Sequence, residues 1–199
     1  LRRLVSEGTR PRLPWAARLT ALAQGPRPIL PLLELLKDDP SAYVRRSVAN
    51  NLNDLSKDNP DLMLDVVAAW LPDADPRRRA LVKHACRSLI KQGHPRCLTL
   101  LGYGKPKLTV AAFSASPVAI ELGETLTLSL ELQSTSSKPQ PLIVDYRFHL
   151  VKANGLTAPK VFKGATFLLE PKSKRTLKKP FHLQPISTRL FNGGFYRTG

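Results

Sequence analysis

The sequence predicts an α + β protein of two domains, an α-solenoid of HEAT-like helical repeats followed by an immunoglobulin-like β-sandwich. Three similar segments recur in the first half, with starts 43 and 38 residues apart: Leu1–Val5, Val44–Val48 and Val82–Cys86. The hydrophobic period then changes from 3.6 to 2 after Gly104-Lys105-Pro106, and proline-marked strand patterns follow. We therefore expect a helical repeat domain over residues 1–104 and a β domain over residues 107–199.

A repeat of about 40 residues is typical of HEAT units, in which two antiparallel helices stack on neighbouring units and share one core. Partner helices rich in Leu and Val are predicted over residues 28–37 and 61–71, and a short last helix over residues 95–101. Pro28 suits a first helical turn, and Ser41 is predicted to be an N-cap. Because the chain opens within a repeat and without methionine, we expect it to be a fragment.

The second repeat predicts one apolar face and one polar stripe. At 100° per residue, the apolar positions that share the core face are Val44, Val48, Leu52 and Leu55. The polar stripe of that helix comprises Arg46, Asn50 and Asp54. The equivalent helical positions are Arg3 and Glu7 in the first unit, and His84, Ser88 and Gln92 in the third. Stacking of the units brings these equivalent positions onto one surface, so we expect a basic groove that contains two acids.

The arginines of this stripe are placed near helix N-termini and the acids near C-termini, the reverse of what the helix dipole favours. Helix N-terminal amides with arginines beside them are suited to phosphate groups. The stripe therefore indicates anion binding. The alternative interpretation is a solvated helix face without function.

Residues 6–15 are the least helix-like part of the first half, and they hold Glu7, Arg10, Arg12 and Trp15. Gly8 and a following proline end the helix that carries Glu7. We interpret this stretch as the rim of an active site. The alternative is an ordinary helix stop followed by a stiff loop, with the tryptophan packed beneath it.

The second half shows alternating strand patterns. Two runs alternate apolar and polar residues, Leu126–Leu132 and Val144–Leu150, and Asn154-Gly155 predicts a hairpin. Six prolines suit strand ends and edges: Pro139, Pro141, Pro159, Pro171, Pro180 and Pro185. A basic run comprises Lys172, Lys174, Arg175, Lys178 and Lys179. This run is either a charged edge strand that resists aggregation or a set of phosphate contacts.

Charge indicates a polyanionic partner. The 199 residues carry a net charge of +16, with 18 Lys and Arg against 10 Asp and Glu in residues 1–106 and 13 against 5 in residues 107–199, so each part contributes +8. An excess spread over both halves indicates extended basic surfaces. A membrane surface is the weaker alternative. No apolar run is long enough to span a bilayer, and none resembles a signal peptide.

Motifs for cofactors and metals are absent from the sequence. It contains no P-loop, no GxGxxG, no HExxH and no clustered Cys or His ligands, so we expect no cofactor and no metal. Cys86 and Cys97 are predicted to be free thiols of a reducing compartment. The four histidines are scattered, and only His84 falls on the groove bearing. Trp70 lies in an apolar helix and is predicted to be core.

Three motifs of the helical half, Ser6–Trp15, Tyr43–Asp54 and Val82–Ala85, resemble the AlkC branch of the HEAT-like-repeat alkylpurine DNA glycosylases. The resemblance extends over nearly the whole chain and includes the immunoglobulin-like extension. It implies a base-excision repair enzyme that removes small cationic methylated bases, chiefly 3-methyladenine, from duplex DNA without a deep base pocket. It also implies catalytic-site carboxylates at Glu7 and Asp54, and an aromatic residue against the lesion nucleotide at Trp15.

The chemistry of such substrates agrees with these residues. A methylated purine already carries positive charge and leaves without a general acid, so carboxylates are needed to stabilise an oxocarbenium-like sugar and orient water. An aromatic ring can face the same charge. The residues predicted to bind DNA are Arg3, Arg10, Arg12, Arg45, Arg46, Asn50, Lys83, His84, Lys172, Lys174, Arg175, Lys178 and Lys179.

The expected partner is double-stranded DNA containing alkylated bases, bound by a monomer without a membrane or an obligate protein partner. The expected location is the bacterial cytoplasm, in association with the nucleoid. Two other functions fit the charge: a non-catalytic HEAT scaffold that binds an acidic protein, and a structured-RNA binder. Neither gives a role to Glu7 and Asp54, so these two acids separate the hypotheses.

Overall fold

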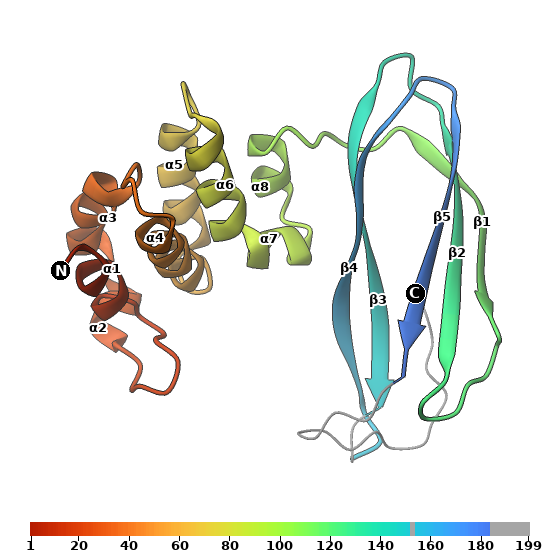
Figure 1. Ribbon diagram of the computed structural model, residues 1–199, viewed down its shortest axis with the longest axis horizontal. Helices are drawn as coiled ribbons and strands as arrows, with labels where there is room; N and C mark the ends of the chain where they lie inside the picture. The colour runs from red at the N-terminus through yellow and green to blue at the C-terminus, as the bar shows by residue number, and fades with distance from the viewer. Residues whose placement is uncertain (152–153, 184–199) are drawn as a thin grey trace. The chain divides into compact units, whose positions relative to one another are not determined.

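The chain forms two compact units in a computed structural model that describes residues 1–151 and 154–183 (Figure 1). The first unit, residues 1–102, is helical, and the second begins at Tyr103 and is built from β-strands. A helical region followed by a β domain is the predicted order. Each unit has its own hydrophobic core.

The helical unit contains short helices, several of which begin at proline. Their bounds are α1 (Arg2–Gly8), α2 (Thr20–Gln24), the 3-10 helix η1 (Arg27–Ile29), α3 (Leu30–Leu36), α4 (Ala42–Leu55), α5 (Pro60–Trp70), α6 (Pro76–Ala85), α7 (Arg87–Gln92) and α8 (Pro95–Leu100). Proline has no N–H to lose and a helical φ, so it suits these first turns. The predicted helices over residues 28–37 and 61–71 correspond to η1 with α3 and to α5.

The core of the helical unit follows the predicted apolar face. Val44, Val48, Leu52 and Leu55 of α4 are all buried and pack with α3, α5 and α6. Trp70 is buried as predicted, and its indole N–H donates to Glu34 Oε2. Helix α4 contacts both α1 and α6, so the three helices that carry the similar segments are neighbours. This places their polar residues around α4.

One local prediction for the helices is confirmed and another needs correction. Ser41 is the N-cap residue of α4, as predicted, although its side chain makes no capping bond; its backbone N–H donates to Asp39 Oδ1 at 2.9 Å. The predicted stripe of His84, Ser88 and Gln92 does not follow one helix, because α6 ends at Ala85 and a new helix begins at Arg87. The start of α6 at Asp75-Pro76 leaves His84 in its last turn, whereas Arg46 lies near the start of α4.

The β unit consists of two antiparallel sheets. Its strands are β1 (Leu108–Ser116), β2 (Thr125–Ser134), β3 (Gln140–Val151), β4 (Thr157–Leu169) and β5 (Lys174–His182). One sheet has the order β1-β2-β5 and the other pairs β3 with β4. Phe148, Phe162 and Phe181 form an aromatic cluster between the sheets, with ring centroids 4.3 to 5.5 Å apart. Of the predicted strand-end prolines, Pro185 lies outside the described residues.

The predicted Asn154-Gly155 hairpin is confirmed. Strands β3 and β4 pair as far as Val151 opposite Thr157. Asn154 Oδ1 accepts a hydrogen bond from the backbone N–H of Leu156 at 3.2 Å, and Gly155 adopts a φ of 74°, which glycine tolerates best. The turn therefore fixes the register of the longest pair of strands.

Gly164 marks a β-bulge in β4, where the register shifts opposite Val144 and Asp145. Its N–H donates to Asp145 Oδ1 at 3.2 Å. A Cβ atom at this position would lie 2.2 Å from Val144 O and 2.7 Å from the Tyr146 ring. The bulge therefore requires glycine for space.

We expect Gly164→Ala to destabilise the β unit by about 2 kcal/mol or more, because backbone atoms must move to admit the methyl group. Urea unfolding followed by circular dichroism measures the loss. Gly104→Ala is the matched control, because nothing lies within 4 Å of a Cβ atom there. Equal stability of the two variants would contradict the close approach at the bulge.

Candidate nucleic-acid interface

The two predicted acids are joined by the buried side chain of Arg10. Helix α1 ends at Gly8, and the Arg10 N–H bonds back to Glu7 O at 3.2 Å, which turns the arginine toward α4. Arg10 Nη1 donates to Glu7 Oε1 at 2.5 Å, and Arg10 Nε donates to Asp54 Oδ2 at 2.8 Å. The arginine is only 7% exposed. It therefore ties the end of α1 to the end of α4.

Glu7 is held on its second oxygen by two buried serines. Ser47 Oγ donates to Glu7 Oε2 at 2.6 Å, and Ser6 Oγ donates to Ser47 Oγ at 2.9 Å. Burial would raise the pKa of Glu7, but hydrogen bonds from Ser47 and Arg10 and the charges of Arg10 and Arg3 hold that pKa below its usual value. Glu7 is therefore an oriented carboxylate anion at neutral pH.

Asp54 has a different environment from Glu7. Its Oδ1 accepts from Lys57 Nζ at 3.1 Å while Oδ2 accepts from Arg10. The side chain of Asp54 is 2% exposed, against 20% for Glu7. The polar stripe predicted for α4 is therefore buried at its last position. Only Glu7 of the two acids reaches solvent in this conformation.

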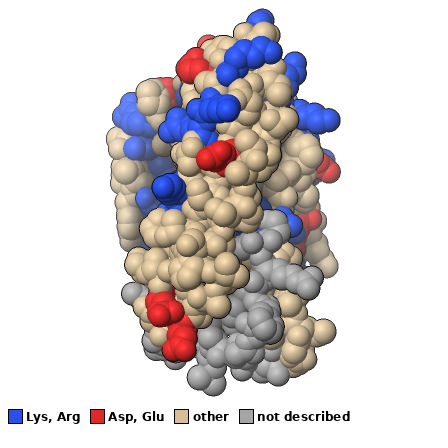
Figure 2. Space-filling view, turned by 90° about the vertical axis from the view of Figure 1, so that its right-hand side faces the viewer, with Lys and Arg blue, Asp and Glu red and all other residues tan. Residues whose placement is uncertain are grey.

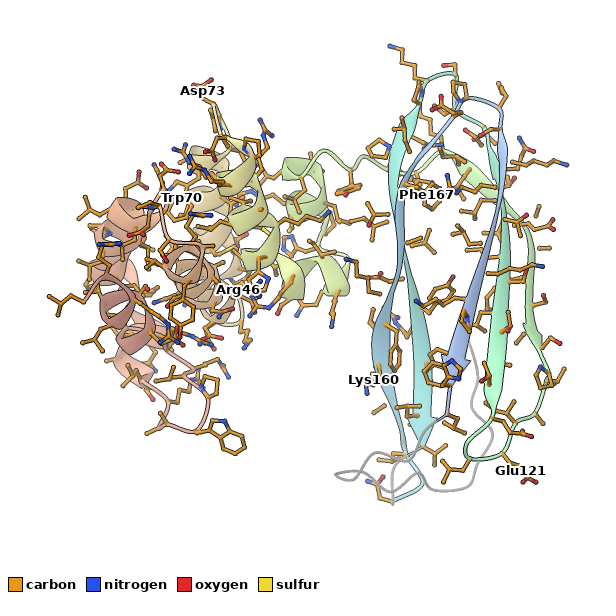
Figure 3. All side chains as sticks on the ribbon, viewed as in Figure 1. Arg46, Trp70, Asp73, Glu121, Lys160 and Phe167 are labelled. Carbon is orange, nitrogen blue, oxygen red and sulfur yellow. The ribbon has the colours of Figure 1, made fainter. Side chains whose placement is uncertain are left out.

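A groove of about 460 Å³ lies between α4 and α6. Its lining includes three arginines and one histidine, namely Arg45, Arg46, Arg77 and His84, and Figure 3 labels Arg46 on α4. The first residues of both helices, Ala42 and Pro76, also line it, so two helix N-termini open there. The structure thus brings together three of the residues predicted to bind DNA. Such a groove presents positive charge to an anion, and the N-terminus of α4 adds N–H donors, whereas α6 begins with a proline and its Arg78 N–H already donates to Asp75 Oδ1.

His84 and Asn50 are brought together beside this groove. His84 Nε2 lies 3.1 Å from Asn50 Oδ1. Burial, followed by the charges of Arg87 and Arg46, lowers the pKa of His84, so the ring is neutral at pH 7. Arg87 donates from Nη1 to His84 O at 2.8 Å. Hydrophobic periodicity did not single out Arg87, since its helix is separate from α6.

Three of the predicted DNA contacts, Arg45 of the groove among them, already have protein partners. The guanidinium of Arg10 is buried between two carboxylates, so its place does not fit a phosphate contact. Arg12 donates to both oxygens of Asp58, at 3.0 and 2.7 Å. Arg45 donates to the backbone oxygens of Asp39 and Pro40 at 2.6 and 2.9 Å. Local sequence does not reveal these pairings, because the partners lie up to 46 residues away.

The loop after α1 presents Trp15 to solvent. Arg12 and Arg18 both bind Asp58, and Leu19 N donates to Pro11 O at 3.0 Å, which closes the loop at its base. Trp15 has a φ of 63° and is fully exposed. The interpretation of Trp15 as packed beneath the loop is therefore wrong. An unpacked indole on a pinned loop is available to a partner.

Four of the five cations of the basic run lie on the edge strand β5, and Lys172 lies in the turn before it. All five cations, Lys172, Lys174, Arg175, Lys178 and Lys179, are exposed, and β5 ends the sheet order β1-β2-β5. Lys174 and Lys178 stand opposite Gln133 and Ser129, whereas Arg175 and Lys179 stand opposite the apolar Leu132 and Leu128. The run therefore divides between two faces of the sheet. Charges on both faces of an edge strand are expected to prevent that strand from pairing with a strand of another molecule.

Charge on the β unit is unevenly distributed along the strands. Figure 2 shows most Lys and Arg toward one end of the near face, with acidic residues both among them and at the other end. The basic end holds Lys172 together with Lys107 and Lys138, which sequence analysis did not single out; Lys172 N donates to Ser136 O, and Ser136 Oγ donates to Lys138 O. Figure 3 labels Glu121 at the opposite end. In the helical unit, Lys83 is exposed on α6 outside the groove lining.

Within residues 1–151 and 154–183, no helix is long and apolar enough to cross a membrane. The same residues contain no group of three or more His, Cys, Asp or Glu side chains that could hold a metal ion. Cys86 and Cys97 are buried and unbridged, as predicted.

Comparisons with known proteins identify relatives over nearly the whole chain. The family model of the C-terminal Ig-like domain of the uncharacterised protein YhaZ matches residues 109–197. The YhaZ protein of Bacillus subtilis is 42% identical over 197 residues, which are 98% of this chain and 54% of that protein. The structure of Pseudomonas fluorescens alkylpurine DNA glycosylase AlkC bound to DNA containing an abasic site analog is 42% identical, with a TM-score of 0.91, and the match covers 96% of this chain and 53% of that one.

These matches confirm the predicted resemblance and the immunoglobulin-like assignment of the β unit. The chain spans about half the length of the relatives it matches. The AlkC structure shows that a protein with this pair of folds binds DNA.

We expect Ser47→Ala to raise the pKa of Glu7, because the carboxylate loses the hydroxyl that stabilises its charged form. Carbon NMR titration of the glutamate carboxyl signals measures the change. Ser56→Ala is the control, since that buried serine at the C-cap of α4 donates to Asn53 O within the same part of the chain. An unchanged Glu7 titration in Ser47→Ala would contradict the assigned hydrogen bond.

The lowered pKa of Glu7 has a consequence for stability. Its contribution to folding is fully present above its usual pKa of 4.5 and is lost as the pH falls through the lower folded value. Ser47→Ala should therefore lose stability at pH 7 and show a smaller further loss on acidification than the wild type. Urea unfolding at pH 7 and at pH 3 tests this, and parallel acid losses in the two proteins would contradict it.

Arg10→Met should destabilise the helical unit by about 3–5 kcal/mol, because Asp54 would be left buried without its arginine partner. Arg12→Met is the matched control and should cost about 1 kcal/mol or less, since the carboxylate of Asp58 is more exposed and keeps Arg18. Chemical unfolding of both variants makes the comparison. Similar losses of stability in the two variants would mean that the buried pairing of Arg10 contributes no more to folding than the exposed pairing of Arg12.

Proposed function

We propose that this chain, which resembles the AlkC branch of the HEAT-like-repeat alkylpurine DNA glycosylases over 96% of its length, belongs to an enzyme of base-excision repair. The proposed reaction is hydrolysis of the N-glycosidic bond of small cationic alkylated bases, such as 3-methyladenine, in duplex DNA. The relatives that this chain matches are about twice its length, so the proposal concerns the activity of the intact protein.

The oriented carboxylate of Glu7 is the observation that carries the proposal. An alkylated purine is a good leaving group because it already carries positive charge, so the protein must supply negative charge beside the sugar rather than a proton. Glu7 is anionic, fixed by Ser47 and Arg10, and partly exposed. It therefore meets the requirements for stabilising an oxocarbenium-like sugar and orienting water.

Asp54 takes a supporting role in this scheme. Its two oxygens are occupied by Arg10 and Lys57, and it is buried. In this conformation it acts on Glu7 through Arg10 by holding the guanidinium in place. Trp15 remains the proposed aromatic contact with the lesion nucleotide, since its exposed ring can face a positively charged base.

DNA binding is assigned to cations that keep their charge available. Among the described residues, Arg46 forms no hydrogen bond or ion pair with the protein, and it lines the groove between α4 and α6. Phosphates contacted in this way fix the register of the duplex and carry no sequence information. Binding should therefore be sensitive to salt and indifferent to sequence.

One observation favours a non-catalytic scaffold for an acidic partner. Arg10 satisfies both carboxylates, so a purely structural role would explain their presence. That interpretation does not explain the hydrogen bonds from Ser6 to Ser47 and from Ser47 to Glu7. It also does not explain why Glu7 stays partly exposed. The two hypotheses differ in what removal of the Glu7 charge does to base excision.

We expect Glu7→Gln in the intact protein to reduce excision of 3-methyladenine at least tenfold and to change duplex affinity little, because the charge matters most in the transition state. Single-turnover excision and equilibrium DNA binding are the measurements. Asp65→Asn is the control, since that exposed aspartate pairs only with Arg96. Full activity of Glu7→Gln would support the scaffold instead.

Arg46→Ala should reduce the slope of log affinity against log salt by about 1, since one phosphate contact is lost. Fluorescence anisotropy with unmodified duplexes of two unrelated sequences measures both slope and sequence preference. Arg96→Ala, whose guanidinium already pairs with Asp65, should keep the wild-type slope. A flat salt dependence of the wild type would favour a protein partner.

A further inference from the structure

Arg3 occupies a position between an exposed aromatic ring and the candidate catalytic carboxylate. Its guanidinium carbon lies 4.2 Å from the centroid of the Tyr43 ring. Its Nη2 lies 3.8 Å from Glu7 Oε2. Tyr43 is 61% exposed, although it stands in the first turn of α4 and was not singled out from the sequence.

Helical spacing explains why Tyr43 and Glu7 meet around the same cation. Tyr43 and Ser47 are four residues apart on α4, so they share one face, and Ser47 donates to Glu7. Arg3 and Glu7 are four residues apart on α1, which packs against α4. The ring from one helix and the carboxylate from the other therefore border a common space.

We propose that Tyr43 and Glu7 border a subsite for a planar cation, which Arg3 fills in the free protein. The ligand class is a delocalised cationic heterocycle, and on the proposed function it is the alkylated purine itself. A guanidinium is also planar, cationic and delocalised, so its two contacts indicate what the subsite accepts. Arg3 makes no other ion pair among the described residues, and its side chain is 43% exposed, so it can leave into solvent.

Displacement of Arg3 gives the subsite a preference for charge. A cationic base that replaces the guanidinium restores both the ring contact and the pairing with Glu7. A neutral base restores neither the pairing with Glu7 nor the cation contact with Tyr43. The interactions that Arg3 gives up are then not replaced, so binding of the neutral base is weaker. Undamaged purines are therefore rejected without a deep pocket. The displaced Arg3 is then available for a phosphate, which agrees with its predicted role in DNA binding.

The test is equilibrium binding of 1-methyladenosine, a planar cation at neutral pH, and of neutral adenosine to the intact protein. Wild type should prefer the cation. Tyr43→Leu should weaken 1-methyladenosine binding about 2- to 30-fold, and Tyr43→Phe should keep it, because the ring provides the contact. Neither substitution should change the binding of adenosine.

Arg3→Gln tests the occupancy by arginine directly. It should tighten 1-methyladenosine binding by at least about threefold, because it removes the competing guanidinium. The size of the gain depends on the fraction of the free protein in which Arg3 fills the subsite. The control is Arg2→Gln, since Arg2 pairs with Asp39 and should not affect the nucleoside. Weaker cation binding in Arg3→Gln, or equal responses of both nucleosides in Tyr43→Leu, would overturn the proposal.

The proposed function and this inference can fail separately. If the intact protein excises no alkylated base yet binds 1-methyladenosine through Tyr43 and Glu7, the subsite stands and the glycosylase is refuted. If excision requires Glu7 but Tyr43→Leu binds 1-methyladenosine as the wild type does, the glycosylase stands and the subsite is refuted.

Discussion

The buried guanidinium of Arg10 is the interaction on which the candidate site depends. Removing an arginine and an aspartate from water costs several kcal/mol for each ion, and the cost is offset only when the charges are paired with good geometry. Arg10 meets this condition by binding Asp54 and Glu7 with different nitrogens. The pairing fixes where α1 ends relative to α4 and gives Glu7 one orientation. Burial of an ion pair is a poor route to stability, so its value here lies in the position of the carboxylate.

The surroundings of Arg10 divide the charges of the helical unit into two kinds. Arg10, Arg12 and Arg45 are committed to acids or backbone oxygens and maintain the fold. Arg46 on α4 and Arg3 on α1 keep more of their charge available, and Arg3 lies beside Glu7. A DNA partner would therefore meet available cations near an anion that Arg10 and Ser47 hold in place. This combination suits a reaction in which the damaged base is itself positive.

Patterns with a fixed period could be predicted from the sequence, and contacts across the fold could not. The core face of α4 follows from 100° per residue, and the hairpin at Asn154-Gly155 follows from turn chemistry. Burial of Arg10 depends on a turn after α1 and on an aspartate 44 residues away, which no local pattern encodes. The break at Cys86 was missed because apolar periodicity continues across it. Tyr43 was missed because the polar stripe was traced from Arg46, although 43, 47, 50 and 54 share one face.

On the proposed function, a positively charged base leaves DNA beside an oriented carboxylate. The most direct measurement is chromatographic detection of free methylated purine after incubation of the intact protein with alkylated duplex DNA. We expect release of 3-methyladenine, with an abasic site left in an unbroken strand. Tight, salt-sensitive binding of the same duplex without any base release would contradict it, and would leave the basic groove as the surface of a binding protein.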